Sequence, residues 1–149
     1  MFEVNHLAKK LVNLTTDTLN VGLIGTGVTI ASRATSENYE FVSQLLANNG
    51  TALTEVSTSG TGYSRQSLTS VSYTQSGLVL TLTANSPSWS GATFGTAYGW
   101  LHDETASSST DATRPLLAIW DFGGAQSVSG ATFTLTVSGS GLITWTAAQ

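Results

Sequence analysis

Short runs in which apolar residues alternate with Ser or Thr recur along most of the chain, and this pattern most limits how it can fold. Residues 131–137, Ala-Thr-Phe-Thr-Leu-Thr-Val, place Phe133, Leu135 and Val137 on one side and threonines on the other. Because successive side chains of a β-strand point to opposite faces, such a run predicts a strand with one apolar face. Ser and Thr make up roughly 30% of the chain, well above average usage, and charged residues only 9%. Solubility therefore depends on hydroxyl groups more than on charges.

The same alternation predicts strands over residues 18–24, 67–73, 78–83, 96–102 and 142–146. Gly77 separates two of these runs and predicts a β-hairpin between them. Residues 138–141, Ser-Gly-Ser-Gly, predict a second hairpin that joins 131–137 to 142–146. A continuous apolar run over residues 115–122 predicts a central strand that is buried on both faces.

Two segments in the first third of the chain have helical spacing instead. Within residues 4–14 apolar side chains recur at intervals of three and four, which predicts a short amphipathic helix. Residues 36–48 repeat that spacing, with Ser36 as the expected N-cap and with Asn49 and Gly50 as the expected stop.

Two other segments are predicted as loops. Pro87 lacks a backbone donor, so residues 86–91 are expected outside the sheets. Residues 103–113 are rich in Ser, Thr and Asp, which is typical of a mobile, solvated loop. With 149 residues the chain is expected to form one domain, 1–149. About seven short strands predict a mainly β fold, a single-domain antiparallel β-sandwich with one or two short helices near the N-terminus.

Composition excludes several classes of function. A net charge of -4 with five Lys and Arg offers no basic surface, so a nucleic-acid partner is not expected. The absence of cysteine excludes disulfides, thiolate zinc sites and a Cys nucleophile. No apolar run approaches the length of a membrane span, and the first residues lack the order of a signal peptide. We therefore expect a protein that is made in the cytoplasm and has no membrane partner.

The residues that bind metals are few. His6 and His102 are the only histidines, and neither has a second ligand at the spacing of a zinc site. His102, Asp103 and Glu104, with Asp111 nearby, have two interpretations. They are either a Ca²⁺-type site or, as we favour, the solvated start of a loop, because the Asp and Asn pattern of an EF-hand is missing. No metal and no cofactor are expected.

Catalytic patterns are equally scarce. The sequence Gly-x-Ser-x-Gly occurs nowhere, and a nucleophilic serine needs an oriented base. Asp121 and Glu55 are candidates for the carboxylate pair of a glycosidase, but their spacing does not show that they face each other. Asp121 is better explained as the end of a strand. We predict no catalytic residue and a protein that is not an enzyme.

The four tryptophans divide by position. Trp100, Trp120 and Trp145 lie within predicted strands, so they are expected to pack in the core. Trp89 lies in the predicted loop 86–91 and is expected at a surface or an interface. Exposed aromatic rings also bind sugars, so a carbohydrate platform is the alternative interpretation.

The order of elements and local motifs resembles that of small virion proteins of tailed bacteriophages, which occur among head and neck structural genes. The resemblance covers most of the chain, except that residues 107–113 are longer and the charge is lower here. The segments that carry it are the first helix, residues 17–24, Glu55-Val56, residues 60–68, Ser88-Trp89-Ser90, residues 98–103, residues 114–123 and Phe133-Thr134-Leu135.

This resemblance implies a capsid decoration or cement protein that binds and stabilises the assembled head, or else a tail, neck or baseplate component, including one that binds host glycans. The implied partners are the major capsid protein or other virion proteins, with many copies or a homo-oligomer in the virion. Such a protein needs exposed apolar or aromatic anchors at its interface. We predict Tyr63, Arg65, Trp89 and Arg114 in this role, with the bracing of a loop as the equal alternative for each of them.

Overall fold

The computed structural model of the chain describes residues 12–14, 16–30, 39–105 and 110–146. Most of this part of the chain is extended, with one short α-helix and one 3-10 helix. Within the described residues the elements are β1 (Leu19–Ile24), α3 (Val42–Ala47), η1 (Asn48–Gly50), β2 (Gln66–Ser67), β3 (Ser72–Ser76), β4 (Val79–Thr83), β5 (Ser88–Asp103), β6 (Leu116–Thr134) and β7 (Ile143–Thr146).

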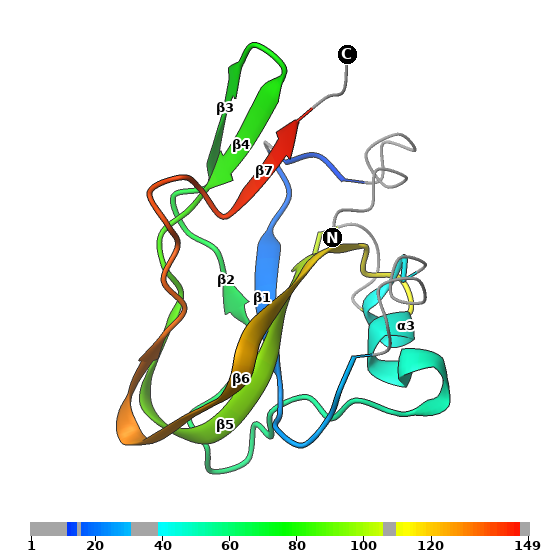
Figure 1. Cartoon of the computed structure of the whole chain (residues 1–149), viewed down its shortest axis with the longest axis vertical. Coiled ribbons are helices and arrows are strands. Elements are labelled where there is room, and N and C mark those ends of the chain that lie inside the picture. Colours follow the sequence, from blue (N-terminus) through cyan, green and yellow to red (C-terminus); the bar gives the residue numbers. More distant parts are fainter. Residues whose placement is uncertain (1–11, 15, 31–38, 106–109, 147–149) are drawn as a thin grey trace.

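Two antiparallel sheets make up the fold, which confirms the predicted mainly β architecture. The first sheet has the strand order β2-β1-β5-β6 and the second has the order β3-β4-β7. The strands β5 and β6 are 16 and 19 residues long and pair along most of their length. They form a curved ribbon that extends to one side of the molecule, while β3 and β4 project as a hairpin at the opposite end (Figure 1).

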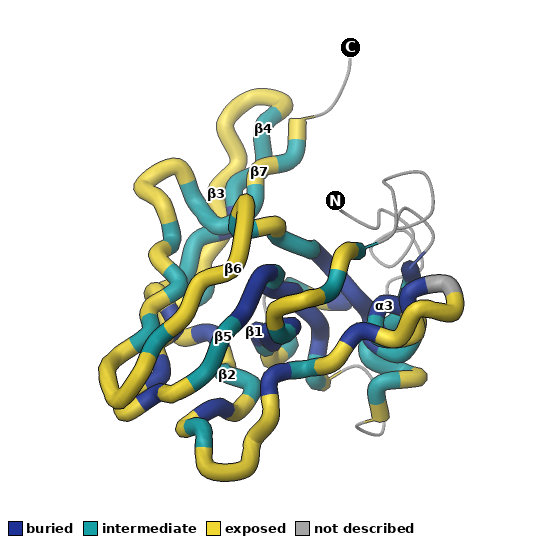
Figure 2. Tube along the Cα trace, turned by 60° about the horizontal axis from the view of Figure 1, so that its bottom comes forward, coloured by how far each residue is buried: buried dark blue, intermediate teal, exposed yellow. Residues whose placement is uncertain are grey.

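Alternation within β1 and β5 places apolar side chains on both faces of the first sheet. Val21 pairs with Leu101 on one face, and Gly22 pairs with Trp100 on the other. Both faces are covered, so β1 is buried on two faces rather than on the one that its alternation predicts. Figure 2 shows that the buried stretches concentrate in β1 and β5, whereas much of β6 is exposed.

Different parts of the chain cover the two faces. On the first face the core extends to the second sheet, through Leu82 of β4 and the partly buried Ile143 and Trp145 of β7. On the second face α3 contributes Val42 and Leu45, which pack in one cluster with β1 and β5 side chains. The members of this second cluster are Ile24, Tyr39, Val42, Leu45, Leu53, Trp100 and Leu116.

The predicted hairpin around Gly77 is confirmed, since β3 and β4 pair from Ser76↔Val79 to Ser72↔Thr83. The run predicted as one strand over residues 67–73 is divided. Its first part belongs to β2, which pairs with β1, and its last part belongs to β3. Ser70 lies between the two with a φ of 53°, a left-handed conformation that interrupts an extended strand.

The predicted hairpin between residues 131–137 and 142–146 is wrong. Residues of 131–137 stay paired with β5, as in Ser88↔Thr134, while β7 pairs with β4, as in Leu80↔Trp145. The chain turns at residues 138–141 and passes close to β4. A Cβ on Gly141 would lie 2.4 Å from Cγ2 of Thr81, so only glycine allows this approach.

The positions of β5 and β6 contradict two further predictions. Residues 115–122 do not form a central strand, because β6 is the edge of its sheet and only its first three residues are buried. Residues 86–91 are not all loop, because β5 begins at Ser88, directly after Pro87. The strand predicted over residues 96–102 is confirmed as part of β5.

The helix predicted over residues 36–48 is shorter in the structure. It begins at Val42 with Phe41 in the N-cap position, where Ser36 was expected, and residues 36–38 lie outside the described part. The side-chain oxygen of Gln44 accepts hydrogen bonds from the N–H groups of Glu40 and Phe41, just before the helix. The N–H groups of Val42 and Ser43 in the first turn donate to backbone oxygens of Arg114 and Asp111.

The C-terminal end of α3 lies near its predicted position, whereas the helix predicted over residues 4–14 is mostly outside the described residues. The helix α3 ends at Ala47, and Asn48 follows in the left-handed region, close to the predicted stop. Of the helix predicted over residues 4–14, residues 4–11 lie outside the described part, and Val12 and Asn13 are not helical.

Candidate functional site

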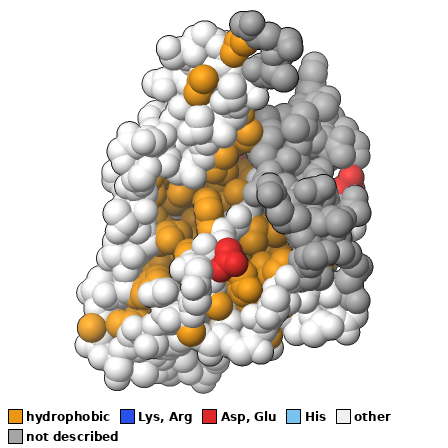
Figure 3. Space-filling model, viewed as in Figure 1, with side chains coloured by type: hydrophobic (Ala, Val, Ile, Leu, Met, Phe, Trp, Pro, Cys, Tyr) orange, Lys and Arg blue, Asp and Glu red, His pale blue; other side chains and the backbone are white. Residues whose placement is uncertain are grey.

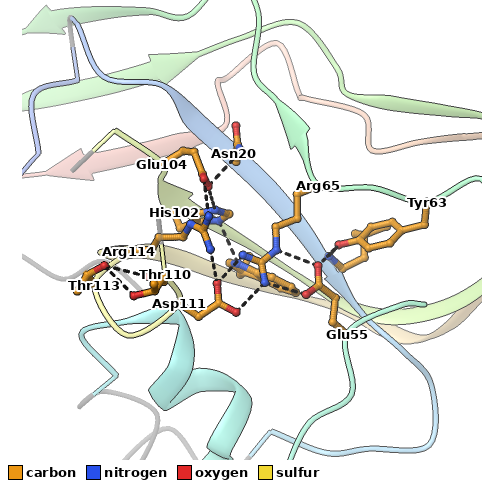
Figure 4. Close-up of polar contacts among 12 residues, drawn as sticks. Asn20, Glu55, Tyr63, Arg65, His102, Glu104, Thr110, Asp111, Thr113 and Arg114 are labelled. Atoms are coloured by element: carbon orange, nitrogen blue, oxygen red, sulfur yellow. Dashed lines mark hydrogen bonds and ion pairs between the residues drawn. The ribbon is translucent and has the colours of Figure 1, made fainter. Parts of the chain in front are cut away.

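Polar side chains from distant parts of the chain meet on the face of the first sheet that α3 also covers (Figure 4). They come from β1, from the segment before β2, from the end of β5 and from the connection between β5 and β6. Of the described residues, the two arginines are both members of this group, and every one of its acids contacts an arginine. We call it the arginine network; its members are Asn20, Glu55, Tyr63, Arg65, His102, Glu104, Asp111 and Arg114.

Arg65 is the centre of the network. Its Nε and Nη2 donate to the two oxygens of Glu55, at 2.9 and 2.7 Å. Its Nη1 and Nη2 also donate to the two oxygens of Asp111, at 2.6 and 3.0 Å. The guanidinium lies 5.3 Å from the ring centroid of Trp100, a cation–π distance. The N–H groups of the guanidinium therefore hydrogen-bond to two carboxylates of the same chain.

Arg114 connects the same group to the end of β5. Its Nη1 donates to Oδ1 of Asp111 at 2.7 Å and its Nη2 to Oε1 of Glu104 at 2.5 Å. Hydrogen bonds from Arg65 lower the pKa of Asp111 to about 2, and Arg114 adds to this effect. Burial alone would raise the pKa of Glu104, but hydrogen bonds from Arg114 and His102 outweigh it and lower that pKa.

His102 lies at the end of β5 with a side chain that is 0% exposed. Its Nδ1 is 3.1 Å from Nε1 of Trp100, and its Nε2 is 3.1 Å from Oε2 of Glu104. An indole N–H only donates, so Nδ1 accepts that bond and Nε2 carries the proton that it donates to Glu104. Burial lowers the pKa of His102 to about 4, so the ring is neutral near pH 7.

Tyr63 joins the network to the aromatic part of the core. Its hydroxyl accepts a hydrogen bond from the backbone N–H of Leu23 at 2.9 Å and donates to Oε1 of Glu55 at 2.8 Å. Burial and then the Glu55 charge raise the pKa of Tyr63. Its ring stacks on Trp89 with 6.2 Å between centroids, and Phe94 meets both rings edge-on.

The titratable side chains of the network are hydrogen-bonded to one another. A general base needs a nitrogen or oxygen within hydrogen-bond reach of a substrate, yet both ring nitrogens of His102 are committed to other side chains. Glu55 is held by Tyr63 and Arg65, whereas Asp121 lies exposed on β6 and accepts a bond from Gly123 N at 2.8 Å. These two carboxylates thus have separate partners.

The candidate cation site of the sequence, His102, Asp103, Glu104 and Asp111, does not come together, because these side chains contact other partners. Asp103 is buried at the end of β5, not the solvated start of a loop, and its Oδ1 accepts a bond from Thr105 N at 2.7 Å. Glu104 and Asp111 face Arg114. Across the described ranges, no three His, Asp or Glu side chains are grouped as metal ligands. Residues 106–109, in the middle of the predicted loop 103–113, lie outside the described part.

Three of the four residues predicted at an interface are members of the network. Tyr63, Arg65 and Arg114 meet in one hydrogen-bonded group, with both arginine side chains less than one fifth exposed. Trp89 was expected at a surface or an interface, and the surface position is wrong. It is 1% exposed, and its indole donates to Ser64 O at 2.7 Å. The prediction that Trp100 packs in the core is confirmed, and Trp120 and Trp145 pack against the core while partly exposed.

Sequence reasoning missed two surface features. The first is the β3–β4 hairpin, where Tyr73 is 42% exposed and Leu78 is 45% exposed. These are the exposed large hydrophobic residues of the described part. Alternation indicated a strand at Tyr73, but it did not show that Tyr73 stays exposed on the face that it shares with the buried Leu82. Leu78 was predicted as the first residue of the strand over 78–83, but it lies in the turn before β4.

The second feature is a hollow between β6 and the segment that leads to β7. Figure 3 shows apolar side chains gathered in this hollow, with an acidic side chain among them. It has a volume of about 280 Å³. We call it the β6 groove. Its apolar lining is Trp120, Phe122, Leu135, Val137 and Leu142, and its polar lining includes Asp121, Thr136 and Ser138.

Within the described residues, no helix is long and apolar enough to cross a membrane. A scan of protein-family models, a search of curated proteins and a search of solved structures each found no match to the chain.

Proposed function

We propose that the protein is a structural protein of a tailed-phage virion, of the capsid decoration or cement kind, which binds the assembled head. The observation that carries this proposal is the projecting β3–β4 hairpin. All five residues of β3 are exposed, and the hairpin presents Tyr73 and Leu78 to solvent. We propose these two side chains as the anchors that contact the head.

The hairpin is suited to burial in an assembly. Residues 72–83 contain no charged side chain, so a partner covers them without removing a charge from water. Aromatic residues are enriched among the residues that dominate binding free energy at interfaces. Many copies on one particle turn a modest free energy per contact into a strong total effect.

The arginine network supports a binding function over a catalytic one. Its arginines, acids and histidine are paired with each other inside the chain. In this proposal the network keeps the segment before β2 and the β5–β6 connection on the sheet. Tyr63, Arg65 and Arg114 then act from inside the protein, and the hairpin makes the contact.

The test is binding to purified heads of the phage that carries this gene. The wild-type chain is expected to sediment with heads in a fixed ratio and to raise their melting temperature, because it binds only the assembled state. The double variant Y73S/L78S should bind at least about tenfold more weakly, since each anchor contributes more than about 1 kcal/mol.

Two comparisons make this test specific. The variant T74S changes an exposed residue of the same strand and should bind as the wild type does. Heads that bind no chain at micromolar concentration would refute the proposal. Binding to isolated tails but not to heads would instead favour the tail, neck or baseplate alternative.

A further inference from the structure

The outer edge of β3 differs from the other sheet edges of the described fold. The first sheet ends at β2 and β6, and the second ends at β3 and β7. Native proteins protect such edges from pairing with other chains by very short strands, bulges, charges or prolines. Strand β2 has two residues, and β7 with four is the shortest strand of its sheet. Along β6 the pairing with β5 shifts register repeatedly, and Asp121 adds a charge.

Strand β3 has none of these protections. It pairs with β4 over five consecutive residues without a register shift. Residues 72–83 hold no charged side chain and no proline. All five residues of β3 are exposed, and across the described residues no strand pairs with its outer edge. This edge therefore offers its backbone groups to an added strand.

The hairpin fixes which backbone groups of β3 point outward. Its loop consists of residues 77–78, and in a two-residue loop the flanking pair, here Ser76↔Val79, exchanges both hydrogen bonds. Bonded and non-bonded pairs alternate along an antiparallel ladder. Every second residue from Ser76 back along β3 therefore bonds to β4, and the N–H and C=O groups of Tyr73 and Gln75 point to the outer edge.

This edge is complementary to itself. When two copies of β3 lie antiparallel about a twofold axis at Thr74, Tyr73 of each copy lies opposite Gln75 of the other, and each such pair exchanges both N–H···O bonds. The two copies of Thr74 face each other as a pair of β-branched residues, which sheets favour. A twofold axis also brings identical charges together, and residues 72–83 have none. A second copy thus fits this edge without repulsion.

We propose that the outer edge of β3 pairs with β3 of a second copy of this chain, antiparallel and centred on Thr74. The two three-stranded sheets then form one continuous sheet, β7-β4-β3 followed by β3-β4-β7 of the other copy. The pairing uses backbone groups at the edge, so it leaves Leu78 at the tip and does not depend on the head binding proposed above. A single five-residue contact is small, so the dimer is weak in solution and is favoured where copies are crowded.

Single cysteines test both the pairing and its register, because the wild type has no cysteine. In T74C the two thiols belong to directly opposite residues whose Cα atoms lie about 4.5 Å apart, within the range for a disulfide. In S72C and in S76C the two cysteines are displaced by four residues along the ladder, about 13 Å, which is too far.

We expect T74C at about 0.1 mM, oxidised with glutathione disulfide, to form covalent dimers at least about tenfold faster than S72C or S76C, because pairing raises the local concentration of its thiols. An equal mixture of S72C and S76C should form the disulfide between the two variants, because residues 72 and 76 lie opposite each other in this register. Each rate is divided by the rate of the same variant with a small thiol reagent, which corrects for accessibility.

The pattern of dimers decides the outcome. Fast dimers in T74C and in the mixture support the proposal. Equal corrected rates in the three single variants would overturn it, because they indicate random encounters. Dimers that form faster in S72C or S76C than in T74C would overturn the proposed register, and the lack of dimers in every variant would overturn pairing with a second copy.

A charge exchange tests the same axis without cysteine. The variants T74K and T74E each place like charges opposite each other and should weaken self-association about two- to fivefold, measured by sedimentation. A mixture of T74K and T74E should associate at least as strongly as the wild type, because opposite charges then meet. If the mixture associates no better than T74K alone, the axis does not lie at Thr74.

Discussion

At the residue scale, His102 shows how burial decides the chemistry of a side chain. Its ring is wholly buried, accepts from Trp100 and donates to Glu104. Arg65 and Arg114 disfavour a positive charge at this ring, and Glu104 favours it. Burial has the largest effect, so the folded protein keeps the ring neutral while an unfolded chain would protonate it below pH 6.5.

This difference predicts a loss of stability in mild acid. Because the pKa of His102 is about 4 in the folded protein and 6.5 ordinarily, the unfolded chain binds an extra proton between these values. Stability therefore falls as the pH drops from about 6.5 toward 4, and from pH 7 to 4.5 this residue accounts for about 2 kcal/mol. Urea unfolding of wild type and H102Q at both pH values measures it.

The H102Q variant provides the control for that measurement. Glutamine does not titrate, so the variant is expected to lose about 2 kcal/mol less than the wild type between the two pH values, whatever its stability at pH 7. Equal losses in the two proteins would show that His102 is not the group responsible. Asp111 contributes only at lower pH, because its pKa falls from 3.8 to about 2.

At the element scale, the pairing of β1 with β5 depends on a size match between opposite residues. Gly22 lies opposite Trp100, and the indole occupies the space where a Cβ of residue 22 would be. The ring is thereby held flat against the sheet, with the guanidinium of Arg65 above it. One glycine thus connects the strand pairing to the arginine network.

We expect G22A to destabilise the protein by about 3 kcal/mol, because a Cβ there would lie 2.1 Å from Cζ2 of Trp100 and must displace the ring. Thermal or urea unfolding measures the change. The matched control is G139A, where nothing lies within 4 Å of the added Cβ, and its effect should stay within about 0.5 kcal/mol. A G22A protein as stable as G139A would contradict this account of the β1–β5 pair.

At the scale of the whole molecule, packing is unevenly distributed. Strands β1 and β5 have a neighbouring strand on each side and cores on both faces. The hairpin β3–β4 pairs on one side with β7, and all residues of β3 are exposed. Local opening is easiest where few apolar contacts hold the backbone, so the two regions should differ in dynamics.

Amide hydrogen exchange should show this difference directly. Peptides from β1 and from residues 98–103 are expected to exchange only through global unfolding, whereas peptides from β3 should exchange at least about 100-fold faster through local opening. Exchange at the peptide level by mass spectrometry measures both regions in one experiment. Equal protection in β3 and β1 would show that the hairpin belongs to the same cooperative unit as the central sheet.

The sequence by itself determined the local features of this protein. Alternation located the strand over residues 18–24 and the β-hairpin around Gly77, since both depend on near neighbours in the chain. The predicted mainly β fold follows from the same periodicity. Scarce charge also indicated a hydroxyl-rich surface. The predictions of a phage virion function and of a protein without catalysis remain proposals.

Only the tertiary structure decided which distant residues meet. Periodicity shows which face of a strand is apolar, but not which edge another strand will join, so the pairing of β7 with β4 was missed. For the same reason we expected Trp89 at a surface or an interface, although it lies in β5, is buried and stacks on Tyr63. Arg65 and Arg114 meet at Asp111 because the sheet brings two connections to one face, and no local pattern encodes that path.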